Sequence, residues 1–168
     1  MKRKSLHQEI VEETLPRFAE HLQQEDVISG YNRKSFKIKF KESFPPFVIK
    51  PDIVLVLADK KRFLVEVVNP KDPKRLMGEL ACVQLLGFHN LIDAAIVFLL
   101  PLGPEHVNAP AKGVRLFQGG QIINDVIGSK VPSVIVSWST REDFNYHNLK
   151  QFILSRRPSW WGIKNNST

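Results

Sequence analysis

Apolar residues near the start of the chain recur with a helical period. Between Leu6 and Gln23 they fall at positions 10, 11, 15, 18 and 22, which is the spacing of an amphipathic helix. Pro16 interrupts this run, because proline lacks an amide hydrogen and its ring collides with the preceding helical turn. We therefore expect either one kinked helix or two shorter helices.

A different period follows in the next segment. Residues 35–41 alternate apolar and basic side chains, which predicts a half-exposed strand with Lys37, Lys39 and Lys41 on one face. Such a basic face could hold a nucleic-acid backbone, or it could only protect a sheet edge from aggregation. The following stretch, ESFPPFVIKP, indicates a loop because paired prolines end regular strand pairing.

Two runs that are apolar on both faces come next. The segments 52–58 and 62–68 are joined by a short DKK turn and predict neighbouring strands inside a sheet covered by helices. Asp72 and Pro73 have the residue types of a helix cap and first helical position, so we expect a helix from there to about Phe88. Residues 91–100 then predict another buried strand.

The remaining segments complete an α/β pattern. We expect a loop with a short element at 103–120, a turn at Gly119 and Gly120 between 114–117 and 122–123, and a strand at 131–138. A helix opened by Ser139 or Thr140 should follow to about residue 157. This order predicts an α/β sandwich in which a central mixed sheet is flanked by helices.

Length and composition limit the number of domains and the cellular compartment that the chain can be expected to have. A chain of 168 residues suits one domain, with a core at about 6–100, an extension at 101–157 and a basic, aromatic tail at 158–168. The single cysteine and the lack of a secretory signal favour a cytoplasmic, intracellular protein, and the longest apolar run is too short to cross a membrane.

The charge balance points to an anionic partner. The chain has 24 Lys and Arg against 17 Asp and Glu, which favours nucleic acid as a partner. Arg156 and Arg157 stand beside Trp160 and Trp161, and this combination could contact phosphates and unpaired bases. Tryptophans in a terminal segment could equally hold it against the domain or against a second copy, so a homodimer stays open.

Asp52 and Glu66 are the unusual residues of the apolar strands. A buried carboxylate without a partner costs several kcal/mol, so two of them together imply a cation between them. A hairpin that pairs Ala58 with Arg62 makes Asp52 and Glu66 diagonal neighbours on the face of the even-numbered residues. That spacing suits one hard divalent cation, whereas a register slip of one residue would separate the two carboxylates.

This pattern resembles a known family. A helix, then Pro51 and Asp52 at the start of a strand, then Glu66 in the next strand, followed by a helix and a strand, is similar to the PD-(D/E)xK nuclease superfamily. The resemblance covers about residues 6–100. It implies a restriction endonuclease-like fold in which Asp52 and Glu66 hold Mg²⁺ or Mn²⁺ and activate water for attack on a DNA phosphodiester.

The resemblance also implies further site residues, and the chain differs from the family pattern at one position. The backbone oxygen of Val67 and one acid of the first helix, taken as Glu13, would be additional metal ligands. The lysine expected two residues after the second acid is Val68 in this chain. A lysine from elsewhere must then reach the site, or cleavage is lost; the nearest candidates are Lys71 and Lys74, followed by Lys50.

Two positions on the expected third helix complete the candidates. Gln84 and Phe88 have the spacing of the Q-x-x-x-Y element of RecB-type nucleases, which makes Gln84 a candidate catalytic residue. Ordinary amphipathicity would instead place Phe88 in the core and Gln84 at its margin. Glu79 could be a site acid on the same helix, but we favour a solvated charge.

The sequence thus supports three functional hypotheses. The first is a Mg²⁺- or Mn²⁺-dependent nuclease acting on DNA. The second is a nuclease-fold module that has lost cleavage and binds nucleic acid or a protein. The third is a structural domain in which Asp52 and Glu66 form salt bridges.

Overall fold

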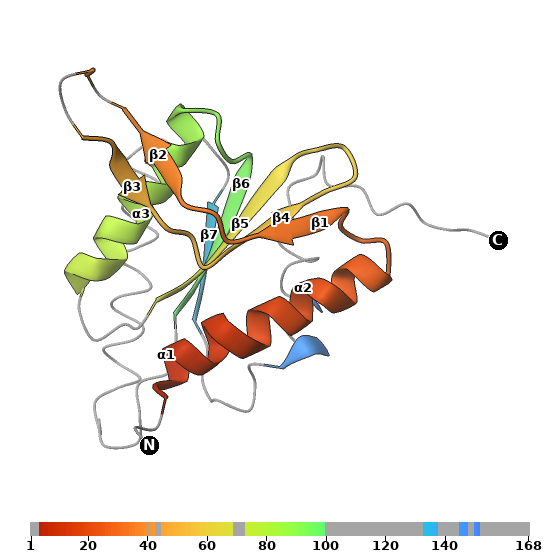
Figure 1. Cartoon of the computed structure of the whole chain (residues 1–168). Coiled ribbons are helices and arrows are strands. Elements are labelled where there is room, and N and C mark those ends of the chain that lie inside the picture. Colours follow the sequence, from red (N-terminus) through yellow and green to blue (C-terminus); the bar gives the residue numbers. More distant parts are fainter. Residues whose placement is uncertain are drawn as a thin grey trace, which may run out of the picture.

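The chain folds around a mixed β-sheet with helices on both faces, as a computed structural model shows (Figure 1). The structure describes residues 4–39, 41–42, 45–68, 73–99, 133–137, 145–147 and 150–151, without the side chains of 73–74, 99 and 133–137. The predicted α/β class with a central mixed sheet is confirmed.

Five strands form the main sheet. In spatial order they are β1 (Gly30–Asn32), β4 (Ile53–Val56), β5 (Arg62–Val68), β6 (Ala94–Leu99) and β7 (Ser133–Ser137). The β1–β4 and β4–β5 pairs are antiparallel, whereas β5–β6 and β6–β7 are parallel. The predicted strands 52–58, 62–68, 91–100 and 131–138 correspond to β4 to β7. Strand β1 was not predicted, because its three residues are too short to show a period.

The N-terminal helical run contains one wide turn. Helix α1 (Leu6–Glu9) leads into a π-helical segment, η1 (Ile10–Thr14), and this continues as α2 (Leu15–Gln24). The amide of Leu15 donates to the oxygen of Ile10, five residues earlier, just before Pro16 removes the next donor. Pro16 therefore perturbs the run as expected, and the perturbation is a π turn within a continuous helix.

The two faces of the sheet bury different residues. Odd-numbered residues of β5 pack in one core with the α1–η1–α2 run, and even-numbered residues pack in a second core with helix α3 (Pro73–Phe88). Figure 1 shows these helices on opposite sides of the sheet. The predicted helix from Pro73 to Phe88 is confirmed, while the cap expected at Asp72 lies outside the described residues.

A second, smaller sheet lies beside α3. Strands β2 (Phe36–Ile38) and β3 (Phe47–Ile49) pair antiparallel, and their residues Ile38 and Ile49 join the core that α3 covers (Figure 1). The strand predicted at 35–41 is therefore shorter than expected. The loop predicted at 42–51 contains a strand, which the paired prolines precede rather than prevent.

The C-terminal segments are described only in part. Residues 146–147 and 150–151 are helical, as predicted, and the ring of Tyr146 lies 5.7 Å from that of Phe18 and 4.9 Å from that of His21. Lys150 pairs with Glu25 of the same helical run. The expectations for 103–123 and for the helix start at Ser139 or Thr140 lie outside the described residues. Among those residues, no helix combines the length and the apolar character needed to cross a bilayer.

Replacing Phe98 tests the central position of β6. Its side chain is fully buried (0% exposed), so Phe98→Ala should lower the free energy of unfolding by about 3–5 kcal/mol. The matched control is Phe88→Ala on the outer face of α3, where the side chain is 67% exposed and the change should stay below about 0.5 kcal/mol. Urea denaturation followed by circular dichroism measures both; equal losses would contradict the described burial.

Candidate functional site

The turn between β4 and β5 sets the position of the two acids. Lys60 adopts a left-handed backbone conformation (φ 71°), and the Asp59 Oδ1 atom accepts the Lys61 amide at 3.1 Å. Leu57 and Lys61 are hydrogen-bonded across the turn, and Val56 faces Arg62. Ala58 therefore belongs to the turn, and the predicted pairing of Ala58 with Arg62 is wrong by two residues.

A shift of two residues keeps both acids on one face of the sheet, because the side-chain period of a strand is two. Continued by one residue beyond Ile53 and Val65, the observed register places Asp52 directly opposite Glu66 instead of diagonal to it. Directly opposed residues have Cβ atoms about 4.5–5.5 Å apart. The two carboxylates are thus closer than the sequence predicted, and both face α3.

The Asp52 side chain is fixed at the end of β4. Its Oδ2 atom accepts the backbone amide of Val67 at 2.8 Å, so the carboxylate takes up a hydrogen bond on the neighbouring strand. A hydrogen bond to the Glu66 side chain adds to this anchoring. The position of Asp52 is therefore determined by β5 itself.

Glu66 is buried in a place where a negative charge is costly. Its side chain is 7% exposed, and burial, the Asp52 carboxylate and Glu79 together raise its pKa to about 9, against an opposing hydrogen bond from the Asp52 backbone. Among the described residues, no Lys or Arg forms an ion pair with Asp52 or Glu66. The salt-bridge hypothesis thus gains no support from these residues, and the raised pKa of Glu66 keeps this side chain protonated near neutral pH.

His7 is a site residue that the sequence analysis missed. Its Nε2 atom is 2.8 Å from the Val67 carbonyl oxygen and 3.9 Å from the Asp52 Oδ2 atom. The Val67 oxygen, expected as a metal ligand, is therefore engaged by a histidine from α1. The only sequence signal was that His7 precedes the buried Val11 by four residues, which puts both toward the sheet.

Helix α3 brings Glu79 near the acidic pair and buries the side chain of Gln84. Gln84 is buried (9% exposed), whereas Phe88 is exposed, so the expectation of a buried Phe88 with Gln84 at the core margin was wrong. Glu79 is half-buried, and burial and the Asp52 charge raise its pKa while Arg75 opposes the rise. Glu79 is thus only partly solvated, and its charge contributes to the raised pKa of Glu66.

At the position where the resemblance expects a lysine, this chain has a residue of the hydrophobic core. Val68 is buried and packs against α3 residues. Of the substitute cations, Lys50 is exposed, Lys74 lies in the first turn of α3 with its side chain undescribed, and Lys71 lies outside the described residues.

An arginine from the β1–β2 connection also reaches this end of the sheet. Arg33 Nε donates to the backbone oxygen of Asp52 at 2.9 Å, and this side chain is partly buried. Strand β1 ends before it reaches Asp52. The Arg33 side chain therefore supplies the hydrogen bond that a strand residue would otherwise donate to this oxygen. The Arg33 side chain is thus bound to the backbone of Asp52, and among the described residues no ion pair joins it to the Asp52 or Glu66 carboxylate.

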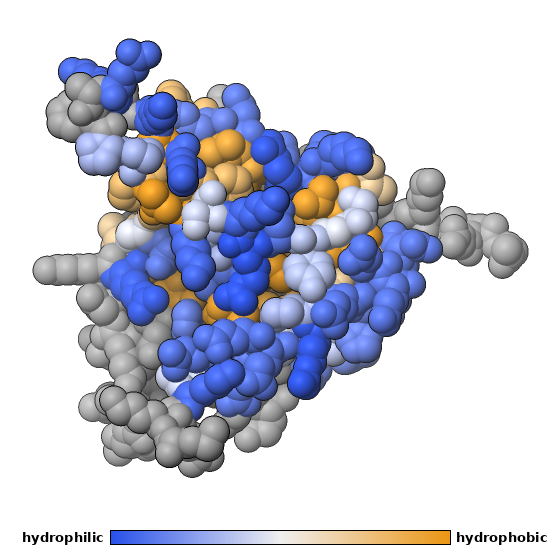
Figure 2. Space-filling model, in the orientation of Figure 1, coloured by the Kyte–Doolittle hydropathy of each residue, from blue (hydrophilic) through white to orange (hydrophobic). Residues whose placement is uncertain are grey.

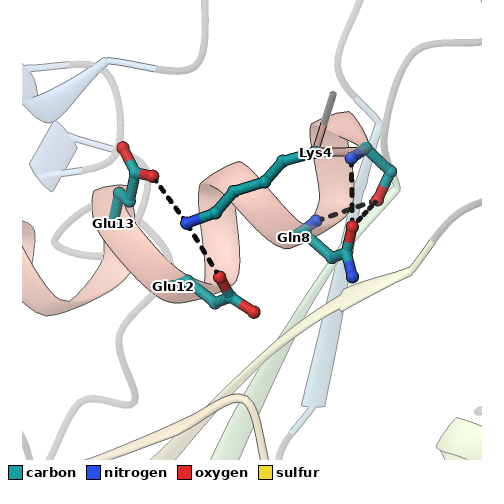
Figure 3. A network of polar contacts seen from close by, with 5 residues as sticks. Lys4, Gln8, Glu12 and Glu13 are labelled. Carbon is teal, nitrogen blue, oxygen red and sulfur yellow. Dashed lines mark hydrogen bonds and ion pairs between the residues drawn. The ribbon is translucent and has the colours of Figure 1, made fainter. Parts of the chain in front are cut away.

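Glu13 is held elsewhere on the helical run. Its Oε1 atom lies 3.0 Å from Lys4 Nζ, which also pairs with Glu12 at 3.0 Å, as Figure 3 shows. Hydrogen bonding to Lys4 lowers the pKa of Glu13, and both acids are exposed. Glu13 therefore lies in a surface ion pair, and in the part of the chain that the structure describes no hydrogen bond or ion pair joins it to Asp52 or Glu66.

The predicted nucleic-acid contacts fall in two places. Lys37, Lys39 and Lys41 are all exposed at the β2–β3 hairpin, where Figure 2 shows hydrophilic side chains around its far end. Only Lys37 lies within a strand. Arg156 and Arg157 lie outside the described residues.

The described residues contain no group of three or more His, Cys, Asp or Glu side chains arranged to hold a metal ion. Comparison of the chain with family models, with curated proteins and with solved structures found no match.

The raised pKa of Glu66 predicts a pH-dependent stability. Folded Glu66 keeps its proton up to about pH 9, whereas the unfolded carboxyl ionises near 4.5, so its stabilising effect is complete below pH 4.5 and is lost as pH rises toward 9. Unfolding free energy of the metal-free protein should fall by up to about 1.4 kcal/mol per pH unit in this window.

Glu66→Gln should flatten that slope, because glutamine does not ionise. Glu12→Gln, which changes an exposed glutamate, should keep the wild-type slope. Urea unfolding at pH 5, 6, 7 and 8 with EDTA measures both variants, and an unchanged slope in Glu66→Gln would contradict the prediction.

Proposed function

We propose that this chain is a Mg²⁺- or Mn²⁺-dependent nuclease of the PD-(D/E)xK type, with a restriction endonuclease-like fold, that hydrolyses DNA phosphodiesters. The single observation that carries the proposal is the opposed pair of Asp52 and Glu66 at the edge of a mixed sheet. The order of elements supports it: after the first helical run come the antiparallel strands β1, β4 and β5 of the main sheet, with the β2–β3 hairpin inserted between β1 and β4, and then helix α3 and the parallel strand β6.

The chemistry of the pair fits a divalent cation. Two adjacent carboxylates repel each other, and in the metal-free protein that repulsion and burial are relieved by keeping a proton on Glu66. A hard cation, which prefers oxygen ligands, would relieve the repulsion and the cost of burial in place of the proton. Two carboxylates leave the remaining coordination positions of the cation to water and phosphate oxygens. Such an ion supplies an activated water and polarises the phosphate.

The other residues have supporting roles in this proposal. His7 donates to the Val67 oxygen and Val67 donates to Asp52, so the helical run and β5 orient the Asp52 carboxylate together. Arg33 supplies the cation that Val68 does not, because its guanidinium is charged at all working pH values and forms several hydrogen bonds in one plane. Lys71, Lys74 and Gln84 remain further candidates for contact with the scissile phosphate.

A second candidate function is binding without cleavage. The observation that favours it is Val68, whose alkyl side chain is buried in the core at the position where the family has its lysine. In that case the domain would bind nucleic acid or a protein through the same surface. Cleavage assays separate the two functions.

The first test removes each acid. With Mg²⁺ or Mn²⁺, the wild-type protein should cleave supercoiled, linear or branched DNA, and Asp52→Asn and Glu66→Gln should each reduce the rate by about 100-fold or more, since each removes charge from the site. Asp59→Asn, at the exposed turn of the same two strands, and Glu12→Gln are the matched controls. Agarose gels quantify the products over time.

The outcomes of this test are distinct. Metal-dependent cleavage that survives in both acid variants would contradict the proposed site. DNA binding without cleavage by the wild-type protein would establish the second candidate, and Mn²⁺ binding measured by calorimetry would show whether the pair still holds an ion.

Replacing Arg33 tests independently whether this side chain takes the role of the lysine that the family has at the position of Val68. Arg33→Gln should slow cleavage by about 100-fold through loss of phosphate-charge stabilisation, while Mn²⁺ affinity stays at the wild-type value. Arg33→Lys should recover part of the rate, and Arg17→Gln, at an exposed arginine of α2, should have no effect. A cleavage rate unchanged by Arg33→Gln would show that another cation serves the site.

A further inference from the structure

The β2–β3 hairpin and its flanks concentrate positive charge. Residues 33–50 contain six cationic side chains and one acidic side chain, Glu42, whereas the whole chain has a net charge of +7. The cationic residues are Arg33, Lys34, Lys37, Lys39, Lys41 and Lys50, and all except the partly buried Arg33 are exposed. This segment therefore provides most of the excess positive charge of the chain.

The inner face of the hairpin is packed against the domain. Phe36 pairs with Ile49 and Ile38 pairs with Phe47, and side chains of directly paired residues share one face of a sheet. Ile38 and Ile49 are buried in the core that α3 covers, and Phe36 packs against that core. Phe47 is 55% exposed but belongs to this same inner face.

The outer face carries lysines from both strands. Lys37 pairs with Val48, and the alternation of side chains along a strand turns both away from Ile38 and Ile49. Continued by one residue beyond each end of the pairing, the same alternation places Lys39 and Lys50 beside Lys37. We call these three exposed lysines the lysine face. In the part of the chain that the structure describes, none of them forms an ion pair.

The remaining positions of the outer face indicate which nucleic acid it suits. They are Ser35, Pro46 and Val48, so this face has no aromatic ring on which an unpaired base could stack. Duplex DNA requires no such ring, because lysines contact its phosphates whatever the base sequence. Its major groove also admits a two-stranded β-ribbon. The outer face therefore fits duplex DNA better than single strands.

The hairpin begins beside the acidic pair. Lys50 precedes Asp52 by two residues, and Figure 1 shows the hairpin extending from there past the main sheet. At about 3.3 Å per residue, the position opposite Lys39 lies at most about 20 Å from Asp52. A DNA strand covers this distance in about six base pairs, at about 3.4 Å each. One duplex could thus contact the lysine face and reach the acidic pair.

We propose that the lysine face of the β2–β3 hairpin binds the phosphates of duplex DNA over about six base pairs on one side of Asp52 and Glu66. Protection of a sheet edge needs charged residues, but it does not need lysines of both strands on one face. A second copy of the chain is disfavoured as the partner, since its own hairpin would carry the same positive charge. Only the position of the duplex relative to a cleaved bond rests on the proposed function.

Binding is measured apart from cleavage. Fluorescence anisotropy with EDTA compares a labelled duplex of 20 base pairs with an oligo(dT) of 20 nucleotides, and the wild-type protein should bind the duplex more tightly. Lys37→Gln, Lys39→Gln and Lys50→Gln should each weaken duplex binding by about 2- to 5-fold. Lys60→Gln, at the exposed lysine of the β4–β5 turn, removes the same charge and should keep the wild-type affinity.

The dependence on salt counts the phosphate contacts. Each of the three substitutions should reduce the slope of log affinity against log salt by about 0.9, and the triple variant should reduce it by about 2.7. Phe47→Ala, on the inner face, should leave the slope unchanged. Thermal melts of each variant check that the substitutions leave the fold intact.

Three results would overturn this inference. One is a wild-type slope in the triple variant, another is an equal loss of slope in Lys60→Gln, and the third is tighter binding of oligo(dT) that Phe47→Ala weakens.

A cleavage assay tests where the duplex lies. On end-labelled duplexes with Mn²⁺, cleavage by the wild-type protein should stop about six base pairs from one end of the labelled strand, and the triple variant should lose this limit. Cleavage up to that end by the wild-type protein would contradict the proposed position. Failure of the wild-type protein to cleave DNA, while the three lysines still determine the salt slope, would contradict only the proposed nuclease activity.

Discussion

The antiparallel pairing of β4 with β5 is the constraint on which the site depends. The turn at Ala58, Asp59 and Lys60 determines the register, and the register sets Asp52 against Glu66 at the far end of the same two strands. Each strand is buried on both faces. A register shift of one residue would turn an acid to the other face, and it would also turn the apolar side chains of the same strand toward the opposite core. The turn at one end of the β4–β5 hairpin thereby determines how close the carboxyl groups of Asp52 and Glu66 lie at the other end.

That electrostatic arrangement draws on both layers of the molecule. His7 approaches from the helical run on one face, Glu79 comes from α3 on the other face, and Arg33 binds the Asp52 backbone where β1 has ended. The strands thus bring the acids together, and the surrounding elements supply the donors and cations. A carboxyl group as buried as Glu66 persists in this apolar strand because its raised pKa keeps it protonated, and therefore uncharged, near neutral pH.

The sequence predicted the parts that depend on apolar periodicity and on helix-capping residues. The bounds of β5 and α3 were confirmed, as was the common face of Asp52 and Glu66. The exact register was not predictable, because a shift of two residues preserves the same pattern of buried and exposed positions. His7 and Arg33 were missed for a related reason: both bind backbone oxygens, which leave no trace in the residue pattern.

The π turn in the first helical run changes how its sequence must be compared with others. Leu6, Ile10 and Val11 contact the core before or within the π segment, and Leu15, Phe18 and Leu22 do so after it, so that Leu15 follows Ile10 by five residues and Val11 by four. A regular helix reaches the same face in three or four residues. A comparison of this run with a regular helix therefore has to allow for one additional residue within Ile10–Thr14.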